Sequence, residues 1–387
     1  MSATEGVTFA PGHTAPSGSV QAHASRALAE ADRLMTVCNS CRYCEGLCAV
    51  FPAMEMRRAF ADGDLNYLAN LCHACGACYV DCQFSPPHEF DVNVPKILAQ
   101  VRNNSYAAYA WPPALRGLFA RNGLAVAVIS ALSIAAFILG FFAWNDATAL
   151  WRAGTEPGAF YRLMPHSTMA LLFGICFVFA LLSLAMGLRA FWRDIGEPAA
   201  TLVAPAPLWR AVKDAASLRY LDGGKAGCFN EGEVPDDRRR LYHHLTFFGF
   251  LLCFAATCVA TLYHYVGGRE APYAWYDLPV LFGTVGGVGL VIGAAGLLRT
   301  KFSRDPAMID RQHLGMDTGF IAMLLAVAGT GLLLLALRGT VLMGLLLALH
   351  LGTVLAFFLT MPYSKFVHGL YRFAALVRYA REREQLL

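Results

Sequence analysis

The sequence predicts an all-α protein, with a small cysteine-rich helical domain followed by six membrane-spanning helices. Two runs of cysteines with identical spacing occupy residues 38–82 and contain eight of the twelve cysteines. Apolar stretches of about 20 residues follow them, long enough to cross a bilayer as helices. Hydrophobic residues make up 57% of the chain and charged residues only 15%. The mean hydropathy of +0.46 excludes an ordinary soluble protein.

The two cysteine runs indicate iron–sulfur chemistry. They read Cys38-x2-Cys41-x2-Cys44-x3-Cys48 and Cys72-x2-Cys75-x2-Cys78-x3-Cys82. In two-cluster ferredoxins such runs hold two [4Fe–4S] clusters, and the fourth cysteine of each run ligates the other cluster. We therefore assign one cluster to Cys38, Cys41, Cys44 and Cys82, and the second to Cys72, Cys75, Cys78 and Cys48. The alternatives are structural zinc, which usually lacks the middle cysteine, and disulfides, which need an oxidising compartment.

The segments before the first span are expected to form three parts. Residues 1–24 are rich in small and polar residues, lack the apolar core of a signal peptide, and are expected to be a disordered tail. Helical patterns over 25–37 and 54–71, the second interrupted by a turn at 62–64, predict an α-helical ferredoxin domain at 25–92. Residues 93–120 are expected to form an ordered linker that leads to the membrane, with Trp111 near its surface.

The membrane domain is predicted at residues 121–375, followed by a tail at 376–387. The six spans are expected at about 122–143, 167–188, 243–265, 279–298, 316–337 and 341–361. With the N-terminus inside, the outer segments hold four Lys and Arg residues, and the inner segments after the first span hold eighteen. The positive-inside rule therefore predicts an inner-membrane protein whose ferredoxin domain and two termini are cytoplasmic.

Two further segments have alternative interpretations. The long inner segment 189–242 is either a solvated loop anchored to lipid headgroups or, because of the Gly-containing stretch 218–228, a folded segment. In the second case it packs on the ferredoxin domain or contacts a partner. The Gly-rich run at 283–296 lies within a predicted span, so it predicts close helix packing and not a nucleotide-binding loop.

Histidines in the spans indicate haem, because imidazole is costly in lipid and usually serves a function there. Those of interest are His243, His244, His264, His350 and His368. One b-type haem is predicted at the inner end, between His368 and either His243 or His244. A second is predicted nearer the outer side, between His264 and His350, with His166 as a rival partner for His264. His350 and His368 are 18 residues apart and share one face of a continuous helix, although Pro362 lies between them.

Several segments resemble the citrate/tricarballylate utilisation protein B family. The resemblance is carried by residues 38–52, 72–79, 86–90, 218–224, 242–244 and 253–255. This family also forms one half of a fused cobalamin-pathway protein. The last span, from His350 to His368, is similar to the haem helix of respiratory nitrate reductase gamma subunits, in which both matching histidines are haem ligands.

The resemblance implies an electron-transfer subunit of a flavoprotein:quinone oxidoreductase. A separate flavin-dependent dehydrogenase would oxidise a tricarboxylate such as tricarballylate or citrate. The membrane protein would then pass electrons from the reduced flavin through two [4Fe–4S] clusters and haem b to the quinone pool. Two alternatives stay open, an oxidase component acting on a tetrapyrrole precursor and a transporter that senses redox state. No nucleic acid is expected as a partner.

Overall fold

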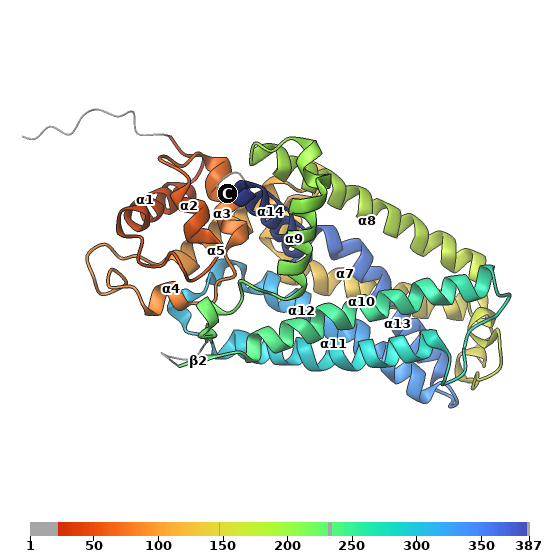
Figure 1. The fold of residues 1–387 in the computed structure, drawn as a ribbon. Coiled ribbons are helices and arrows are strands. Elements are labelled where there is room, and N and C mark those ends of the chain that lie inside the picture. Colours follow the sequence, from red (N-terminus) through yellow and green to blue (C-terminus); the bar gives the residue numbers. More distant parts are fainter. Residues whose placement is uncertain (1–21, 147, 231–233, 385–387) are drawn as a thin grey trace, which may run out of the picture.

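The computed structural model describes residues 22–146, 148–230 and 234–384, and their regular secondary structure is almost entirely helical (Figure 1). The prediction of an all-α fold is confirmed. Most of the predicted disordered tail, residues 1–21, lies outside the described residues. A compact group of short helices occupies one end of the molecule, and long helices extend away from it (Figure 1).

The cysteine-rich domain is built from five helices. They are α1 (Arg26–Cys41), α2 (Val50–Glu55), α3 (Asp62–Leu71), α4 (Ala77–Val80) and α5 (Val94–Ala108). Helix α1 begins after Ser25, whose hydroxyl accepts a hydrogen bond from the amide of Leu28, and it continues four residues beyond the predicted helix. The predicted helix at 54–71 forms only from residue 62 onward, because α2 ends at Glu55 and a non-helical stretch follows.

Helix α5 lies within the segment predicted to be a linker. Asn93 precedes it and accepts a hydrogen bond from the amide of Lys96, while Pro95 occupies the first turn. Both residue types favour a helix start, but they are also common in loops, so the sequence alone does not distinguish a helix from a linker here. The helix packs on α1 and α3 and buries Leu98 and Tyr106 completely. It therefore forms part of the core beneath the cysteines.

The structure contains six helices long and apolar enough to cross a membrane among its described residues, as predicted. They are α7 (Asn122–Trp144), α8 (His166–Asp194), α10 (Arg238–Tyr265), α11 (Leu278–Ser303), α12 (Leu314–Leu337) and α13 (Met343–Thr360). Short connecting helices are α6 (Gly117–Ala120), η1 (Pro113–Leu115), η2 (Ala149–Trp151), η3 (Ala159–Arg162), η4 (Ala199–Val203), η6 (Pro306–Met308) and η7 (Arg311–His313). Their length and composition indicate a multi-pass membrane protein.

The glycines of α11 allow it to lie directly against α10. A Cβ atom added to Gly293 would lie 2.6 Å from the backbone nitrogen of Thr246, closer than real side chains approach. One added to Gly286 would lie 2.8 Å from the backbone oxygen of Gly249. The predicted role of the Gly-rich run in close helix packing is therefore confirmed.

The last predicted span and the helix that carries His368 are two separate helices. Helix α13 ends at Thr360, a short turn η8 (Met361–Tyr363) follows, and Ser364 is extended. A separate helix, α14 (Val367–Glu384), begins after it. The prediction that His350 and His368 share one face of a continuous helix is therefore wrong. Pro362 and the extended Ser364 reset the helical phase.

The inner segment 189–242 is folded and packs on the cysteine domain. It contains α9 (Pro205–Ala216), η5 (Gly223–Lys225), and a short antiparallel pair of β1 (Cys228–Phe229) and β2 (Pro235–Asp236). The amide of Phe229 donates to the carbonyl of Cys75 at 2.8 Å, and Leu221, Cys228 and Phe229 form a buried cluster with Cys75 and Ala77. Of the alternatives for this segment, contact with the ferredoxin-like domain is the one that the structure shows.

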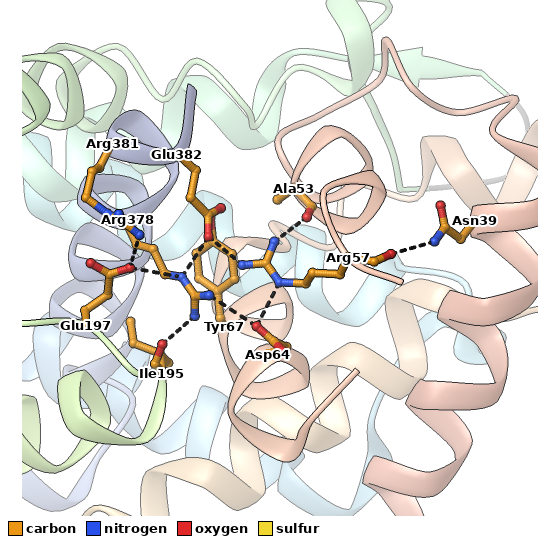
Figure 2. Close-up of polar contacts among 10 residues, drawn as sticks. All are labelled: Asn39, Ala53, Arg57, Asp64, Tyr67, Ile195, Glu197, Arg378, Arg381 and Glu382. Carbon is orange, nitrogen blue, oxygen red and sulfur yellow. Dashed lines mark hydrogen bonds and ion pairs between the residues drawn. The ribbon is translucent and has the colours of Figure 1, made fainter. Parts of the chain in front are cut away.

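Helix α14 connects the cysteine domain to the membrane helices through a buried ion network (Figure 2). Arg57 of the cysteine domain pairs with Asp64 at 2.8 Å and with Glu382 of α14 at 2.5 Å. Arg378 of α14 pairs with the same Glu382 at 2.9 Å and with Asp64 at 3.1 Å. Both guanidinium groups lie over the ring of Tyr67, at 4.9 and 4.3 Å. The two parts of the protein are thus docked in one fixed orientation.

Candidate functional site

The first group of thiols contains Cys38, Cys41, Cys44 and Cys82. Burial, and to a lesser extent repulsion from the neighbouring thiolates of Cys44, Cys82 and Cys41, raises the pKa of Cys38 to about 12. Burial also raises the pKa of Cys44 to about 12, with Cys82 and Cys41 as its nearest charged neighbours. The chain therefore brings the fourth cysteine of the second run beside the first three of the first run.

The second group contains Cys48, Cys72, Cys75 and Cys78. Burial raises the pKa of Cys48 well above its usual range, and Cys75 and Cys72 add to this shift. The pKa of Cys78 is raised in the same way by burial and then by Cys75, Cys48 and Cys72. The strongest thiol neighbours of these cysteines are thus those of the crossed ligand pattern, and Cys44 of the first group is a weaker neighbour of Cys78. All eight cysteines are free thiols.

No group of three or more His, Cys, Asp or Glu side chains in the described parts of the chain is arranged to hold one metal ion. Four sulfurs around one zinc, each at about 2.3 Å, would lie within about 4 Å of one another. In a four-iron cluster each thiolate binds a different iron, so the sulfurs stand farther apart. A four-iron cluster therefore does not require the single-ion arrangement that these thiols lack.

Backbone amides also point at the sulfurs. The amide of Ala74 donates to Sγ of Cys72 at 3.3 Å, and that of Phe84 donates to Sγ of Cys82 at 3.4 Å. Hydrogen bonds to cysteine sulfurs stabilise the negative charge of a thiolate and tune the potential of a bound cluster. Eight free thiols and these hydrogen bonds are therefore suited to iron–sulfur ligation.

The two groups differ in exposure. In the first group Cys41 is exposed, and Tyr43, next to Cys44, retains 74% of its surface, so one side of this group faces solvent. Cys72 and Cys75 are buried at 7% and 8% exposure. Their surroundings include Val50, Phe51, Val94, Pro95 and Tyr220. We call the first set the outer thiol group and the second the inner thiol group.

Gly76 shows how tightly the chain wraps the inner thiol group. Its φ of +93° lies in the region that favours glycine. A Cβ added there would lie 3.0 Å from the sulfur of Met308 and from the carbonyl oxygen of Phe229. A side chain at position 76 would therefore strain the backbone and press on Met308 and Phe229.

The inner end of the bundle brings three histidines together beside this group. His243 on α10 and His368 on α14 are close enough to interact electrostatically. His73, adjacent to Cys72, is also near His243; burial lowers its pKa well below the usual value, with the charge of Arg372 adding to this. Burial also lowers the pKa of His368 to about 3, again with Arg372 contributing. His73 and His368 are therefore neutral, which is the form of imidazole that binds metal ions.

His368 has a hydrogen bond typical of a metal ligand. Its Nδ1 contacts the carbonyl oxygen of Lys365, which fixes the ring and leaves Nε2 for another partner. His244 points elsewhere: its Nε2 lies 3.2 Å from the carbonyl oxygen of Ala216, and its ring stacks on Phe248. Of the two neighbouring histidines on α10, the structure therefore places His243, and not His244, beside His368.

His264 and His350 do not face each other, contrary to the sequence-based prediction for the outer haem. His264 stacks on His166 of α8, with ring centroids 3.5 Å apart and an interplanar angle of 21°. His350 instead faces α12, where its Nδ1 lies 3.1 Å from the hydroxyl oxygen of Thr330. The structure thus brings His264 together with the rival partner His166, and not with His350.

The sequence reasoning did not select His73 or several arginines near it. His73 lies within the Cys72-x2-Cys75 step, and Arg372 lies four residues after His368, so both have a positional signal. Arg239 lies in the segment for which lipid anchoring is one of the two sequence-based alternatives, but it donates to the backbone of His73 and Ala74. Their importance depends on contacts between distant segments, which spacing within one segment does not reveal.

Comparisons with known proteins agree with this division of the chain. Residues 31–108 match a family model described as "Citrate utilization protein B Fer4-like domain". Residues 117–386 match one described as "Citrate utilization protein B". A relative from Escherichia coli, named citrate utilization protein B, is 47% identical over 361 residues, which cover 92% of this chain and 93% of the relative. No solved structure matches the chain.

Proposed function

Because the chain belongs to the citrate utilization protein B family, we propose that it is a membrane-bound electron-transfer protein. It would oxidise the reduced flavin of a cytoplasmic tricarballylate- or citrate-type dehydrogenase and deliver the electrons to quinone. Two [4Fe–4S] clusters and haem b, when bound, would each accept and release one electron at a time. The cysteine domain and both termini would face the cytoplasm, as the charge distribution favours.

The spatial order of the ligand groups is the single observation that carries this proposal. Cys41 of the outer thiol group is exposed, and so a soluble partner can reach that group. Cys44 of the outer thiol group is among the charged neighbours of Cys78 in the inner one, so the two groups are close enough to interact electrostatically. His73, next to Cys72, interacts in the same way with His243, and His243 with His368. This order supports one path from solvent to the inner end of the membrane helices.

The protein's own residues hold these groups at fixed positions and shield them from water. The ion network of Arg57, Arg378 and Glu382 fixes the cysteine domain on α14, the helix that carries His368. The segment 218–229 covers the inner thiol group and buries Leu221, Cys228 and Phe229 there. A fixed separation and the exclusion of water both favour transfer between neighbouring centres, because fewer groups must reorganise when the charge moves.

The proposal is tested with anaerobically purified protein. We expect about eight irons and as many acid-labile sulfides per chain, together with a b-type haem spectrum. Reduced FMN, used as the donor, should then reduce a quinone analogue in proteoliposomes that contain the protein. The His243→Ala variant serves as the control, because its iron–sulfur sites should still be reduced while quinone is not. A preparation with zinc and no acid-labile sulfide, or wild-type protein that reduces no quinone, contradicts the proposal.

The structure gives less support to a transporter. That alternative needs polar or charged groups that bind a solute within the spans. The acidic residue of α12 nearest the inner end, Asp317, is paired with Lys301 and, at 2.9 Å, with Lys365. Its charge is therefore balanced by the protein itself, as expected for a structural contact.

A further inference from the structure

Four arginines from four separate segments converge on the loop that carries Cys72 and Cys75. Arg102 of α5 donates to the carbonyl oxygen of Cys72 at 2.7 Å, and Arg372 of α14 donates to the same oxygen at 2.9 Å. Arg239 of α10 donates to the carbonyl oxygens of Ala74 and His73, at 2.7 and 3.0 Å. Arg304, just after α11, donates to Ala74 at 2.5 Å. We call these four residues the arginine collar.

The collar brings positive charge without an acidic counterpart. Arg102 and Arg304 are only 6% and 8% exposed. Across the described residues, no ion pair joins any of the four to a carboxylate, whereas the buried Arg57 and Arg378 are each paired with acids. Isolated buried charges are strongly unfavourable, so the collar requires a negative group nearby. The inner thiol group would supply it as thiolates when they ligate iron, because Cys75 and Cys72 are among the charged neighbours of Arg304.

Further donors in the collar stay unused. The Nε atoms of Arg102 and Arg304 are buried and have no hydrogen-bond partner in the described parts of the chain. Each guanidinium therefore retains charge and hydrogen-bonding capacity beyond the carbonyl contacts that orient it. This is the arrangement expected when a larger anionic group completes the site.

The outer thiol group has no comparable surroundings. Its neighbour Asp81 is acidic and contributes to the raised pKa of Cys44. The nearby Arg42 is exposed, and its Nε donates to the carbonyl oxygen of Asn39 at 3.1 Å. Solvent screens an exposed charge much more strongly than a buried one. The two thiol groups thus have the same ligands and opposite electrostatic surroundings.

We propose that the arginine collar makes the inner [4Fe–4S] site easier to reduce than the outer one, and so sets the direction of electron flow toward the membrane. This inference rests on the proposed function, which supplies the two clusters. In the step concerned, the outer site loses one electron and the inner site gains it, and no bond or proton changes place. Reduction adds one negative charge at the inner site, and the fixed positive charges of the collar stabilise that added charge.

The test is a redox titration of the intact protein in detergent, with the reduced clusters followed by electron paramagnetic resonance. The Cys41→Ser variant should lose the outer cluster and keep the inner one, so its spectrum identifies the signal of the inner cluster. Arg239→Gln removes one charge from the collar, while Arg239→Lys retains it with fewer hydrogen bonds. We expect Arg239→Gln to lower the potential of the inner cluster and leave the outer one unchanged, and Arg239→Lys to remain near wild type. Arg42→Gln is the matched control beside the outer cluster.

Two results would overturn the inference. One is an inner potential that is unchanged in Arg239→Gln; the other is an equal fall in the Gln and Lys variants, which would show that hydrogen bonding and not charge matters. If Arg239→Gln loses iron, Arg372→Gln is measured in its place, with the same criterion. Quinone reduction is recorded separately on wild-type protein. If Arg239→Gln shifts the inner potential but the wild-type protein reduces no quinone, only the proposed function is contradicted. If the wild-type protein reduces quinone but the potential of the variant is unshifted, only the role of the collar is contradicted.

Discussion

Replacing Arg57 with alanine should weaken the docking of the cysteine domain on the membrane helices and lower the free energy of unfolding. The change removes the ion pairs to Asp64 and Glu382, a hydrogen bond to the carbonyl of Ala53, and the contact with the ring of Tyr67. Breaking a buried ion pair by removing one partner typically costs about 3–5 kcal/mol. Glu382 keeps Arg378 as a second cation, so we expect the lower end, about 3 kcal/mol.

Urea unfolding of the purified protein in detergent measures this loss, followed by circular dichroism and by the visible absorbance of the clusters. With a slope of about 3 kcal/mol per M, a loss of about 3 kcal/mol lowers the midpoint by about 1 M. Arg33→Ala is the matched control, because its 2.6 Å pair with Glu30 is about 40% exposed on both sides. An exposed pair contributes less than about 1 kcal/mol, so its midpoint should move by less than about 0.3 M.

The double variant Arg57→Ala with Glu382→Gln gives a sharper criterion. Residues in one ion network show coupling energies of about 0.5–3 kcal/mol in double-mutant cycles. If the two losses simply add, or if Arg57→Ala shifts the midpoint no more than Arg33→Ala, the network does not hold the two parts together. The docking argument would then be wrong.

Three further changes test the sites and the packing. Cys41→Ser should reduce bound iron from about eight to about four per chain, measured by iron and sulfide analysis. An unchanged iron content would contradict the assignment of Cys41 to a cluster. His243→Ala should abolish much of the b-type spectrum while His244→Ala retains it, so equal spectra would refute the assignment of His243. Gly293→Leu should lower the thermal midpoint of the α10–α11 pair, because its side chain would meet Thr246. A midpoint equal to that of wild type would show that close contact between α10 and α11 does not contribute to stability.

Much of the fold could be predicted because its signals are local. A span needs only about 20 apolar residues, and a cluster motif only a fixed spacing, so the six membrane helices and the two sets of cysteines were visible in the sequence. Helix α5 was missed because Asn93 and Pro95 are common both in loops and at helix starts. Its identity as a helix depends on packing against α1 and α3, which the sequence does not display.

The histidines show where such local reasoning ends. The shared-face prediction for His350 and His368 assumed a continuous helix, and the extended residue Ser364 breaks it. Proline alone permits either a kink or a break, and the choice is made by tertiary contacts such as the hydrogen bond from Asn122 to the carbonyl of Tyr363. The choice between His243 and His244 likewise follows from the neighbours of α10, and not from its own sequence.

The arginine collar depends even more on the assembled protein. Arg102, Arg239, Arg304 and Arg372 come from segments that span 270 residues of sequence, yet all four donate to the backbone of residues 69–74. Positive charge near a membrane-spanning helix is ordinarily explained by topology or lipid headgroups, and Arg239 fits that explanation by position alone. Its hydrogen bonds to His73 and Ala74 place it instead between the inner thiols and the histidines. Membrane helices thereby supply half of the collar around the cysteine loop, so the inner thiol group has its full electrostatic surroundings only when the cysteine domain is docked on the bundle.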